Sequence, residues 1–259
     1  MLLDETRGRT VAVSGKGGTG KTVISAIMVK LLSQREVGRI LAIDADPATS
    51  LATALGVRAR KTVGDIREMM YQDSLSQNPV SSPVPLDMLL ENHIADILVE
   101  TDKFHLLVMG RPEGPGCYCL LNDMLRYIID KLSHSFDITV IDCEAGLEHL
   151  SRRTMRKLDF LFVVTDPTKR GLDTAGSIKE LAQKMEIDVG KACLIINKTS
   201  DEDEAFYKKV ASEIVGVVPV DGNITQYDRI GRPILDLPDN SPSVQAVQEI
   251  LGKTLFATT

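Results

Sequence analysis

The sequence predicts an α/β fold: a doubly wound, mainly parallel sheet of seven to eight strands with helices on both faces. Short runs of apolar and β-branched residues alternate with longer segments of helical period along the 259 residues. The short runs are apolar at consecutive positions, which is typical of parallel strands that are covered on both faces. The expected strands are Thr10–Ser14, Ile40–Ile43, Phe104–Met109, Ile138–Ile141, Phe160–Thr165, Cys193–Ile196 and Val215–Val218.

Helical patterns fill the intervals between these strands. The segment 71–85 is instead rich in Ser, Pro, Asn and Gln, which predicts an exposed loop or insertion. Because strands of the same style continue beyond it, we expect a single domain over residues 1–259. The expected helices are Lys21–Gln34, Leu86–Glu100, Leu120–Leu132, Leu147–Lys157, Leu172–Met185, Glu202–Ile214 and Ser243–Leu251.

Composition and charge exclude several classes of protein. With 43% hydrophobic residues the chain can bury a core, and 30 Lys and Arg against 36 Asp and Glu give a net charge of −6. No global basic field therefore favours nucleic acid or an anionic membrane as a partner. The N-terminus lacks the pattern of a signal peptide, and four cysteines are too few for a secreted disulfide framework. We expect a cytoplasmic protein.

The strongest motif follows the first expected strand. Gly15-Lys16-Gly17-Gly18-Thr19-Gly20-Lys21-Thr22 satisfies G-x-x-x-x-G-K-[ST] and leads directly into a helical pattern. The glycines allow backbone N–H groups to surround a phosphate, Lys21 can reach the β- and γ-phosphates, and the Thr22 hydroxyl can bind Mg²⁺. A chance match in a glycine-rich turn is the alternative, and the strand–loop–helix context argues against it.

Carboxylates at the ends of two other strands complete the expected site. Asp142 follows an apolar run, at the end of a strand where such sheets present ligands, and we expect it to be the carboxylate that supports Mg²⁺. The alternative is that Asp142 only caps the following turn. Asp44 and Asp46 follow the second strand, and we expect Asp44 near Mg²⁺ and Asp46 orienting the attacking water; a simple Asp-Pro turn is the alternative. Gly146 is expected to donate its N–H to the γ-phosphate from a nucleotide-sensing loop that starts at Cys143.

These motifs resemble the MinD/ParA/nitrogenase-iron-protein class of dimeric ATPases. The resemblance rests on the second lysine of the loop, Lys16, on Asp44-Ala45-Asp46-Pro47, and on the segment from Asp142 to Gly146. It implies that ATP holds two copies of the chain face to face and that Lys16 reaches the partner's nucleotide, as an arginine finger does. A solvated loop lysine is the alternative. The resemblance also implies that Asn197, Lys198 and Pro219 lie at the nucleotide base.

Two further segments resemble the CooC-type nickel-insertion ATPases within that class. They are Gly110 to Cys119, which ends in Cys117-Tyr118-Cys119, and Gly146-Leu147-Glu148-His149-Leu150. The resemblance implies that Cys117 and Cys119 bind Ni²⁺ or Zn²⁺. The segment Lys198-Thr199-Ser200-Asp201 after Asn197 has one residue more than the guanine-specific N-K-x-D spacing, which favours ATP over GTP.

The chemistry of the cysteine pair is compatible with that implication. Two thiolates can bind one borderline metal, and tetrahedral structural sites usually have four ligands, so two copies of the chain would supply a complete set. Gly114-Pro115-Gly116 predicts that the pair lies in a loop, whereas buried or incidental thiols are the alternative. We expect Cys193 in the core, and Cys143 either packed there or responsive to metal.

The leading hypothesis is an ATP-hydrolysing metallochaperone. Nucleotide-dependent homodimerisation would be coupled to nickel binding and to insertion into carbon monoxide dehydrogenase or acetyl-CoA synthase, the implied client enzymes. Two alternatives stay open: a MinD/ParA-like spatial regulator, and an iron–sulfur electron-transfer ATPase that resembles the nitrogenase iron protein.

Overall fold

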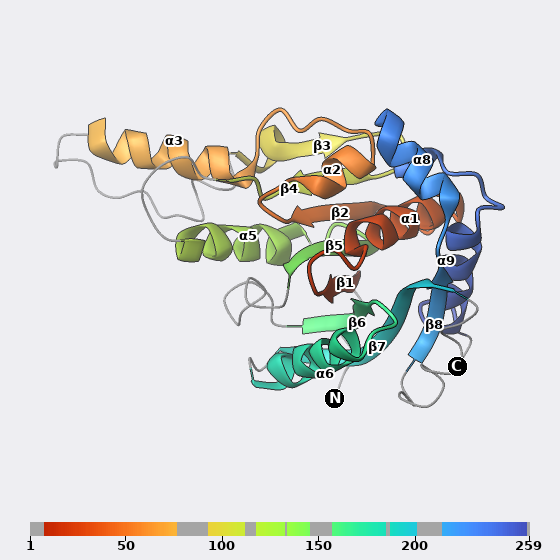
Figure 1. The fold of residues 1–259 in the computed structure, drawn as a ribbon. Coiled ribbons are helices and arrows are strands. Elements are labelled where there is room, and N and C mark those ends of the chain that lie inside the picture. Colours follow the sequence, from red (N-terminus) through yellow and green to blue (C-terminus); the bar gives the residue numbers. More distant parts are fainter. Residues whose placement is uncertain are drawn as a thin grey trace.

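A central eight-stranded sheet organises the molecule (Figure 1). The computed structural model describes residues 8–76, 93–111, 118–132, 134–145, 157–184, 187–200 and 214–257. The strand order is β3-β4-β2-β5-β1-β6-β7-β8, and all neighbours are parallel except the β3–β4 pair. The predicted α/β sheet is therefore confirmed. The strands are β1 (Arg9–Gly15), β2 (Ile40–Ala45), β3 (Leu98–Glu100), β4 (His105–Val108), β5 (Ile138–Ala145), β6 (Lys157–Thr165), β7 (Asp188–Thr199) and β8 (Ile214–Pro219).

Strand β3 is one element whose type the sequence misassigned. Residues 93–97 are helical as expected, but 98–100 pair with β4 instead of continuing the helix predicted to end at Glu100. An apolar run as short as Ile97-Leu98-Val99 does not distinguish a helix from a strand by its period. The unpaired edge of β4 decides the outcome, because it offers hydrogen bonds to this segment.

Four of the expected helices are present in the part of the chain that the structure describes, and a fifth is helical only at 93–97. The prediction Lys21–Gln34 matches α1 at both ends, and α5, α6 and α9 differ from their predictions by a few residues. Two further predicted helices, Leu147–Lys157 and Glu202–Ile214, lie outside the described residues except for their last residues. Lys157 and Ile214 are the first residues of strands β6 and β8, so the predicted helix ends are wrong at these two positions. The predicted loop 71–85 is wrong for residues 71–76, which continue a helix, and its remainder is not described. The helices are α1 (Lys21–Gln34), α2 (Ser50–Ala54), α3 (Val63–Ser76), α5 (Tyr118–Leu132), α6 (Lys169–Lys184), α8 (Gly222–Ile230) and α9 (Pro242–Lys253), with a 3₁₀ turn, η2 (Ile234–Asp236).

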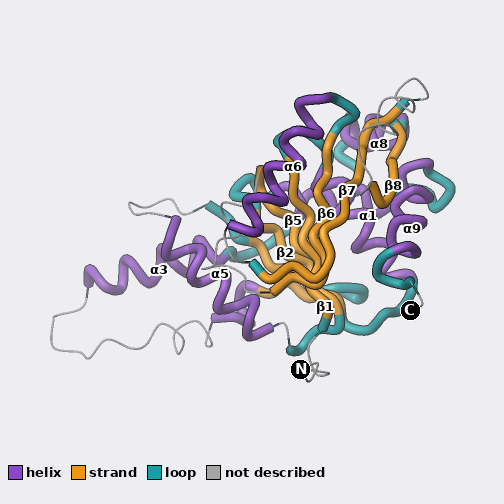
Figure 2. The backbone as a smooth tube through the Cα atoms, turned by 90° about the horizontal axis from the view of Figure 1, so that it is seen from below, coloured by secondary structure: helices purple, strands orange, loops and turns teal. Residues whose placement is uncertain are grey.

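Helices lie on both faces of the sheet (Figure 2), and a separate hydrophobic cluster packs on each face. Successive side chains of a strand point to opposite faces, and β1 shows this directly. Val11 and Val13 pack in a cluster with α1, α2 and α9, whereas Ala12 between them packs in a cluster with α3 and α5. All three are fully buried, so β1 lies at the centre of the molecule and carries the loop at its end in a fixed position.

A buried carboxylate joins the last two helices. Asp221 follows β8 and caps α8, because its Oδ1 accepts a hydrogen bond from Asn223 N at 2.9 Å. Its Oδ2 accepts from Ser243 N at 3.1 Å, from Ser243 Oγ at 2.7 Å and from Ser241 Oγ. One side chain thus fixes the starts of both α8 and α9.

Among the helices that the structure describes, none has the length and apolar character needed to cross a bilayer.

Candidate nucleotide site

The loop between β1 and α1 is tightly folded on one side and open on the other. Gly20 has a φ of 90°, and a Cβ at this position would lie 2.3 Å from the Asn197 side-chain nitrogen, so only glycine fits without strain. By contrast, a Cβ at Gly17 or Gly18 would meet no atom within 4 Å. The tight contacts hold the loop, while its open side leaves room for a ligand to approach the backbone.

The two lysines of the loop have different environments. Lys21 opens α1 and is only 8% exposed, and its Nζ donates a hydrogen bond to the Lys16 carbonyl oxygen at 3.2 Å. Thr19 Oγ1 donates to the same carbonyl at 2.9 Å. The Lys16 side chain itself is exposed. Lys21 is therefore positioned over its own loop, whereas Lys16 is free to reach a group outside the chain.

Asp142 lies beneath the start of α1 and is hydrogen bonded to it. Thr22 Oγ1 donates to Asp142 Oδ2 at 2.7 Å, and Ser25 Oγ donates to Oδ1 at 3.0 Å. Asp142 is 1% exposed, on the face of β5 that is covered by α1. Sequence reasoning paired Thr22 with Asp142 and missed Ser25. The available signal was spacing, because residues three apart share a helix face.

Asp44 and Asp142 are direct neighbours in the sheet. They face each other in the register of β2 and β5, and both are buried. Asp44 Oδ2 accepts a hydrogen bond from Ala52 N at 3.1 Å, and Oδ1 accepts from Asp46 N at 3.3 Å. Asp46 lies on the following turn, where its Oδ1 accepts from Ala48 N at 2.8 Å. The structure thus contains both the turn expected of an Asp-Pro sequence and the expected pair of carboxylates at the carboxyl end of the sheet.

Burial raises the pKa of both sheet carboxyls. The pKa of Asp44 is raised to about 7, mainly by burial and further by the neighbouring charge of Asp142, against the lowering effect of the Ala52 hydrogen bond. The pKa of Asp142 is raised to about 6 by burial, although its hydrogen bonds from Thr22 and Ser25 lower it. A divalent cation would relieve this repulsion, and oxygen atoms of carboxylates and hydroxyls are the ligands that Mg²⁺ prefers. The donor set therefore fits Mg²⁺.

The end of β7 contacts the loop from the other side. Asn197 Nδ2 donates to the Thr19 carbonyl at 2.7 Å, and Lys198 Nζ donates to the Gly18 carbonyl at 2.8 Å. Pro219 ends the adjacent strand β8, paired with Thr199. The structure thus brings the three residues expected near the base to the same edge of the sheet as the loop. The two side-chain contacts to the loop backbone were not anticipated from the sequence.

The remaining predicted site residues are Gly146, Cys117 and Cys119. Gly146 and Cys117 lie outside the described residues. Cys119 falls in the first turn of α5, so the prediction that both cysteines lie in a loop is wrong for this residue. Among the residues that the structure describes, no group of three or more His, Cys, Asp or Glu side chains is arranged to hold a metal ion.

The other two cysteines are core residues. Cys143 and Cys193 are each 3% exposed, as expected for Cys193 and for the packing interpretation of Cys143. Burial raises the pKa of both thiols. The sensing loop was predicted to begin at Cys143, but β5 continues to Ala145, so that boundary is wrong. Pairing with β1 and β2 extends the strand beyond the apolar run.

The raised carboxyl pKa values predict that the nucleotide-free fold loses stability as the pH rises. Each folded-state pKa exceeds the unfolded value of 3.8, so the stabilising contribution is complete below about pH 4. It is lost progressively as the pH rises through about 6 and about 7. Asp142→Asn is expected to raise the free energy of unfolding at pH 8 by about 1–3 kcal/mol, because it removes a buried charge. At pH 4 the free energy of unfolding should be nearly unchanged, because Thr22 and Ser25 can also donate to an amide oxygen or accept from its nitrogen.

Urea denaturation at the two pH values measures this effect. The matched control is Asp228→Asn, on an exposed position of α8, which should not alter the difference between the two pH values. A variant at Asp142 that is less stable than the parent protein at pH 8 would contradict the prediction.

The fold and the loop define a nucleotide-binding protein of the P-loop type. A parallel sheet, a glycine-rich loop between β1 and α1, and a carboxylate hydrogen bonded to the threonine of that loop are its defining parts. Residues 10–234 match the model of the CobQ/CobB/MinD/ParA nucleotide binding domain, and the chain belongs to this family.

Individual relatives extend over nearly the whole chain. An uncharacterized ATP-binding protein of Methanocaldococcus jannaschii is 44% identical over 249 residues, 95% of this chain and 98% of that protein. The carbon monoxide dehydrogenase accessory protein CooC of Rhodospirillum rubrum is 33% identical over 241 residues, 88% of this chain and 89% of that protein. Among solved structures, the cell division ATPase MinD of Pyrococcus furiosus matches with a TM-score of 0.70 and 23% identity, covering 95% of this chain and 98% of that one.

Proposed function

We propose that this protein is a single-domain, ATP-hydrolysing metallochaperone that dimerises with nucleotide and delivers nickel to carbon monoxide dehydrogenase or acetyl-CoA synthase. The observation that carries the ATPase part is the hydrogen bond from Thr22 to Asp142. This bond brings the threonine of the glycine-rich loop and the carboxylate of β5 together, as a magnesium–nucleotide site requires. The cargo part is supported by the similarity to CooC and by the Cys117-Tyr118-Cys119 motif.

Each residue of the site has a role in this proposal. The N–H groups of residues 15–22 surround the phosphates, and Lys21 moves from the Lys16 carbonyl to the β- and γ-phosphates. Thr22, Asp44 and Asp142 would hold Mg²⁺, which neutralises phosphate charge when it is bound.

Hydrolysis joins a water oxygen to the γ-phosphorus and breaks the bond to the bridging oxygen, which leaves with ADP. Asp46 orients this water, and the Gly146 N–H stabilises the γ-phosphate. At the other end of the nucleotide, Asn197, Lys198 and Pro219 border the adenine, with Asn197 and Lys198 also holding the loop.

A homodimer supplies the remaining charge and the cargo site. The exposed Lys16 reaches the nucleotide of the second copy. Nickel, or zinc in its place, is cargo bound by Cys117 and Cys119 of both copies as thiolates. The start of α5 at Tyr118 supports this role, because the positive end of a helix favours the thiolate form of nearby cysteines. Nucleotide state would then change metal affinity through the dimer.

Removal of both sulfur atoms is expected to abolish tight nickel binding. Replacing Cys117 and Cys119 together with serine should lower the nickel affinity of the ATP-loaded protein at least about 100-fold, since serine is a poor ligand for borderline metals at neutral pH. Calorimetric titration with Ni²⁺ measures this. Cys193→Ala, in the core, is the matched control and should retain the parent affinity. Unchanged nickel affinity in the double variant would contradict the assignment.

Two alternatives make different demands on the molecule. A spatial regulator that attaches to membranes through its C-terminal helix needs an exposed apolar face, but Val244, Val247, Ile250 and Leu251 of α9 are at most 1% exposed and pack against the core. ATP-dependent sedimentation with anionic vesicles or DNA would nevertheless support that reading. Iron and sulfide in anaerobically purified protein, with visible absorption, would support the electron-transfer alternative.

A further inference from the structure

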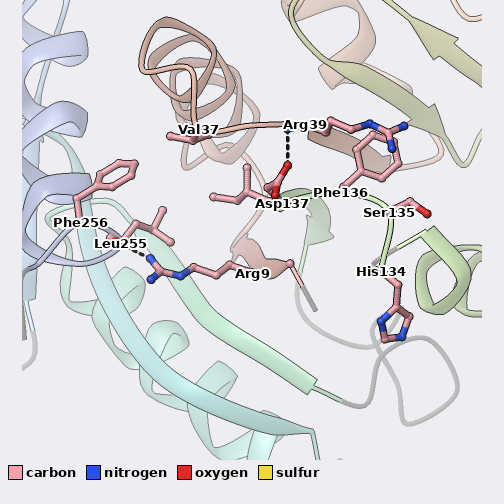
Figure 3. Close-up of a pocket in the computed structure, with 11 residues that line it drawn as sticks. Arg9, Val37, Arg39, His134, Ser135, Phe136, Asp137, Leu255 and Phe256 are labelled. Carbon is pink, nitrogen blue, oxygen red and sulfur yellow. Dashed lines mark hydrogen bonds between the residues drawn. The ribbon is translucent and has the colours of Figure 1, made fainter. Parts of the chain in front are cut away.

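The carboxylates at the two ends of β5 are held in different ways. Asp137, the residue before β5, accepts a hydrogen bond from Arg39 N at 2.7 Å and is exposed beside a pocket (Figure 3), so water can reach its remaining acceptor sites. Asp142, near the other end of the strand, is 1% exposed. A buried carboxylate needs hydrogen-bond donors from the protein itself, because an unpaired buried polar group is costly. The donors around Asp142 therefore cannot be replaced by water.

Two turns of α1 supply the donors for Asp142. Thr22 Oγ1 donates to Oδ2 at 2.7 Å, and Ser25 Oγ donates to Oδ1 at 3.0 Å. Because the two bonds reach different oxygen atoms of one carboxylate, the group cannot rotate about its own axis without breaking one of them. Thr22 alone would hold one oxygen and leave the other free to turn. The orientation of this carboxylate therefore depends on Ser25.

The hydroxyl of Ser25 lies at a position of α1 where an apolar side chain would be expected. Ser25 is fully buried, and both of its neighbours in the chain are buried and apolar. A serine inside a helix commonly donates to the carbonyl four residues earlier, and Ser33 of the same helix does so, at 2.8 Å from the Val29 oxygen. Ser25 instead donates across to β5. Alanine is the better helix former, so the contact with Asp142 accounts for a serine here.

The neighbouring carboxylate of Asp44 makes this donor more important. Asp44 and Asp142 face each other across β2 and β5, and their charges repel. The two oxygens of Asp44 accept from the N–H groups of Ala52 and Asp46, at 3.1 and 3.3 Å. With the two hydroxyls of α1 on Asp142, each of the four oxygen atoms accepts a hydrogen bond. Without the Ser25 hydroxyl, one oxygen would lack its donor beside a second carboxylate, and the group would turn.

We propose that Ser25 is a positioning residue for divalent-metal binding, because its hydroxyl fixes the orientation of the Asp142 carboxylate. This inference rests on the proposed function, in which Thr22 and Asp142 hold Mg²⁺ with the nucleotide. Each carboxylate oxygen has a further acceptor site beyond the one that its hydrogen bond uses. Ser25 is not itself a ligand in this proposal; it sets the direction in which the acceptor sites of Asp142 point. Residues that orient metal ligands in this way change metal affinity by about 10- to 100-fold.

Mn²⁺ binding to the ADP complex tests the proposal, with the electron paramagnetic resonance signal of free Mn²⁺ as the readout. Mn²⁺ takes the same oxygen ligands as Mg²⁺. Ser25→Ala is expected to lower the Mn²⁺ affinity of the ADP complex at least about 10-fold. It should leave the affinity for ADP without metal within about threefold of the parent, since no hydrogen bond to the nucleotide is lost. Ser33→Ala, which removes a hydroxyl from the same helix, is the matched control and should change neither affinity.

A double-mutant cycle shows whether Ser25 acts through Asp142. In protein that already carries Asp142→Asn, adding Ser25→Ala should change the Mn²⁺ affinity by less than about twofold, because residues that act as one unit are not additive. A merely structural effect of the lost hydroxyl would add in full to that of Asp142→Asn. If Ser25→Ala does not fold, Ser25→Cys, which keeps the size and a weak donor, should show a smaller loss of the same kind.

The outcomes separate this inference from the proposed function. Unchanged Mn²⁺ affinity in Ser25→Ala, or an equal loss with and without Asp142→Asn, would overturn the role of Ser25 and leave the proposed function intact. If the ADP complex of the parent protein binds Mn²⁺ no more tightly than free ADP does, Thr22 and Asp142 hold no metal, and both proposals fail.

Discussion

Lys21→Ala is expected to weaken ATP binding between about 10- and 150-fold and to abolish hydrolysis. The side chain lies at the start of α1 with its ammonium on the Lys16 carbonyl, within the loop that receives the phosphates. A hydrogen bond to a charged group contributes about 1.5–3 kcal/mol, which corresponds to that range of affinity. The fold should persist, because the ammonium holds a loop carbonyl that Thr19 also binds. Titration with a fluorescent ATP analogue and phosphate release measure the two effects.

Lys16→Ala is the matched comparison, since it removes the same charge from the same loop. Its side chain is exposed and makes no contact on which the loop depends, so we expect affinity within about threefold of the parent, given the small contribution of exposed charges. If Lys16 acts on the second copy's nucleotide, hydrolysis and ATP-dependent dimerisation should nevertheless be lost. Phosphate release measures the hydrolysis, and light scattering measures the dimerisation. Normal hydrolysis in Lys16→Ala, or unchanged ATP affinity in Lys21→Ala, would contradict the proposed division of roles.

The parts of the site that sequence predicted are those encoded by local spacing. The loop from Gly15 to Thr22 carries its own geometry, because glycine positions and the following helix are adjacent in the chain. Asp142 was found because the carboxyl end of a parallel strand is where such sheets present ligands. Its neighbour Asp44 was found for the same reason, but their direct register, and hence the raised pKa of each, required the strand order.

The missed features depend on contacts between distant segments. Asn197 and Lys198 reach the loop backbone only because β7 lies two strands from β1, an arrangement that no local pattern contains. The short strand β3 forms because the edge of β4 is available. The helix α3 was missed because its polar residues resemble those of a loop, whereas packing against α5 on the sheet decides its structure. The hydrogen bond from Arg9 to the Leu255 carbonyl also depends on the two ends of the described chain meeting.

Asp221→Ala is expected to destabilise the protein by about 3–5 kcal/mol, the cost of leaving buried charged or polar partners unpaired. Asp221 is 6% exposed, and its loss removes the cap of α8 and the acceptor for Ser241 and Ser243 at the start of α9. These groups have no access to bulk water in its place. The two helices would lose their common anchor, and α9 covers one face of the sheet beside β8.

The pH dependence distinguishes this carboxylate from the pair at the nucleotide site. Burial alone would raise the pKa of Asp221, but the hydrogen bonds from Ser241, Ser243 and Asn223 outweigh burial and hold the pKa below its usual value. Its stabilising contribution is therefore present above about pH 4 and is lost as the pH falls through the lower folded-state pKa, opposite in sign to Asp44 and Asp142. The difference in unfolding free energy between parent and Asp221→Ala should accordingly shrink at acid pH.

Urea denaturation at neutral and acid pH tests the magnitude and the sign together. Asp239→Ala is the control: this carboxylate also accepts hydrogen bonds, from Lys30 and Gln34, but its side chain is 71% exposed. Water can replace Asp239 for both partners, so its loss should have a much smaller effect. Equal losses in the two variants would contradict the prediction, because the two residues differ chiefly in their access to water.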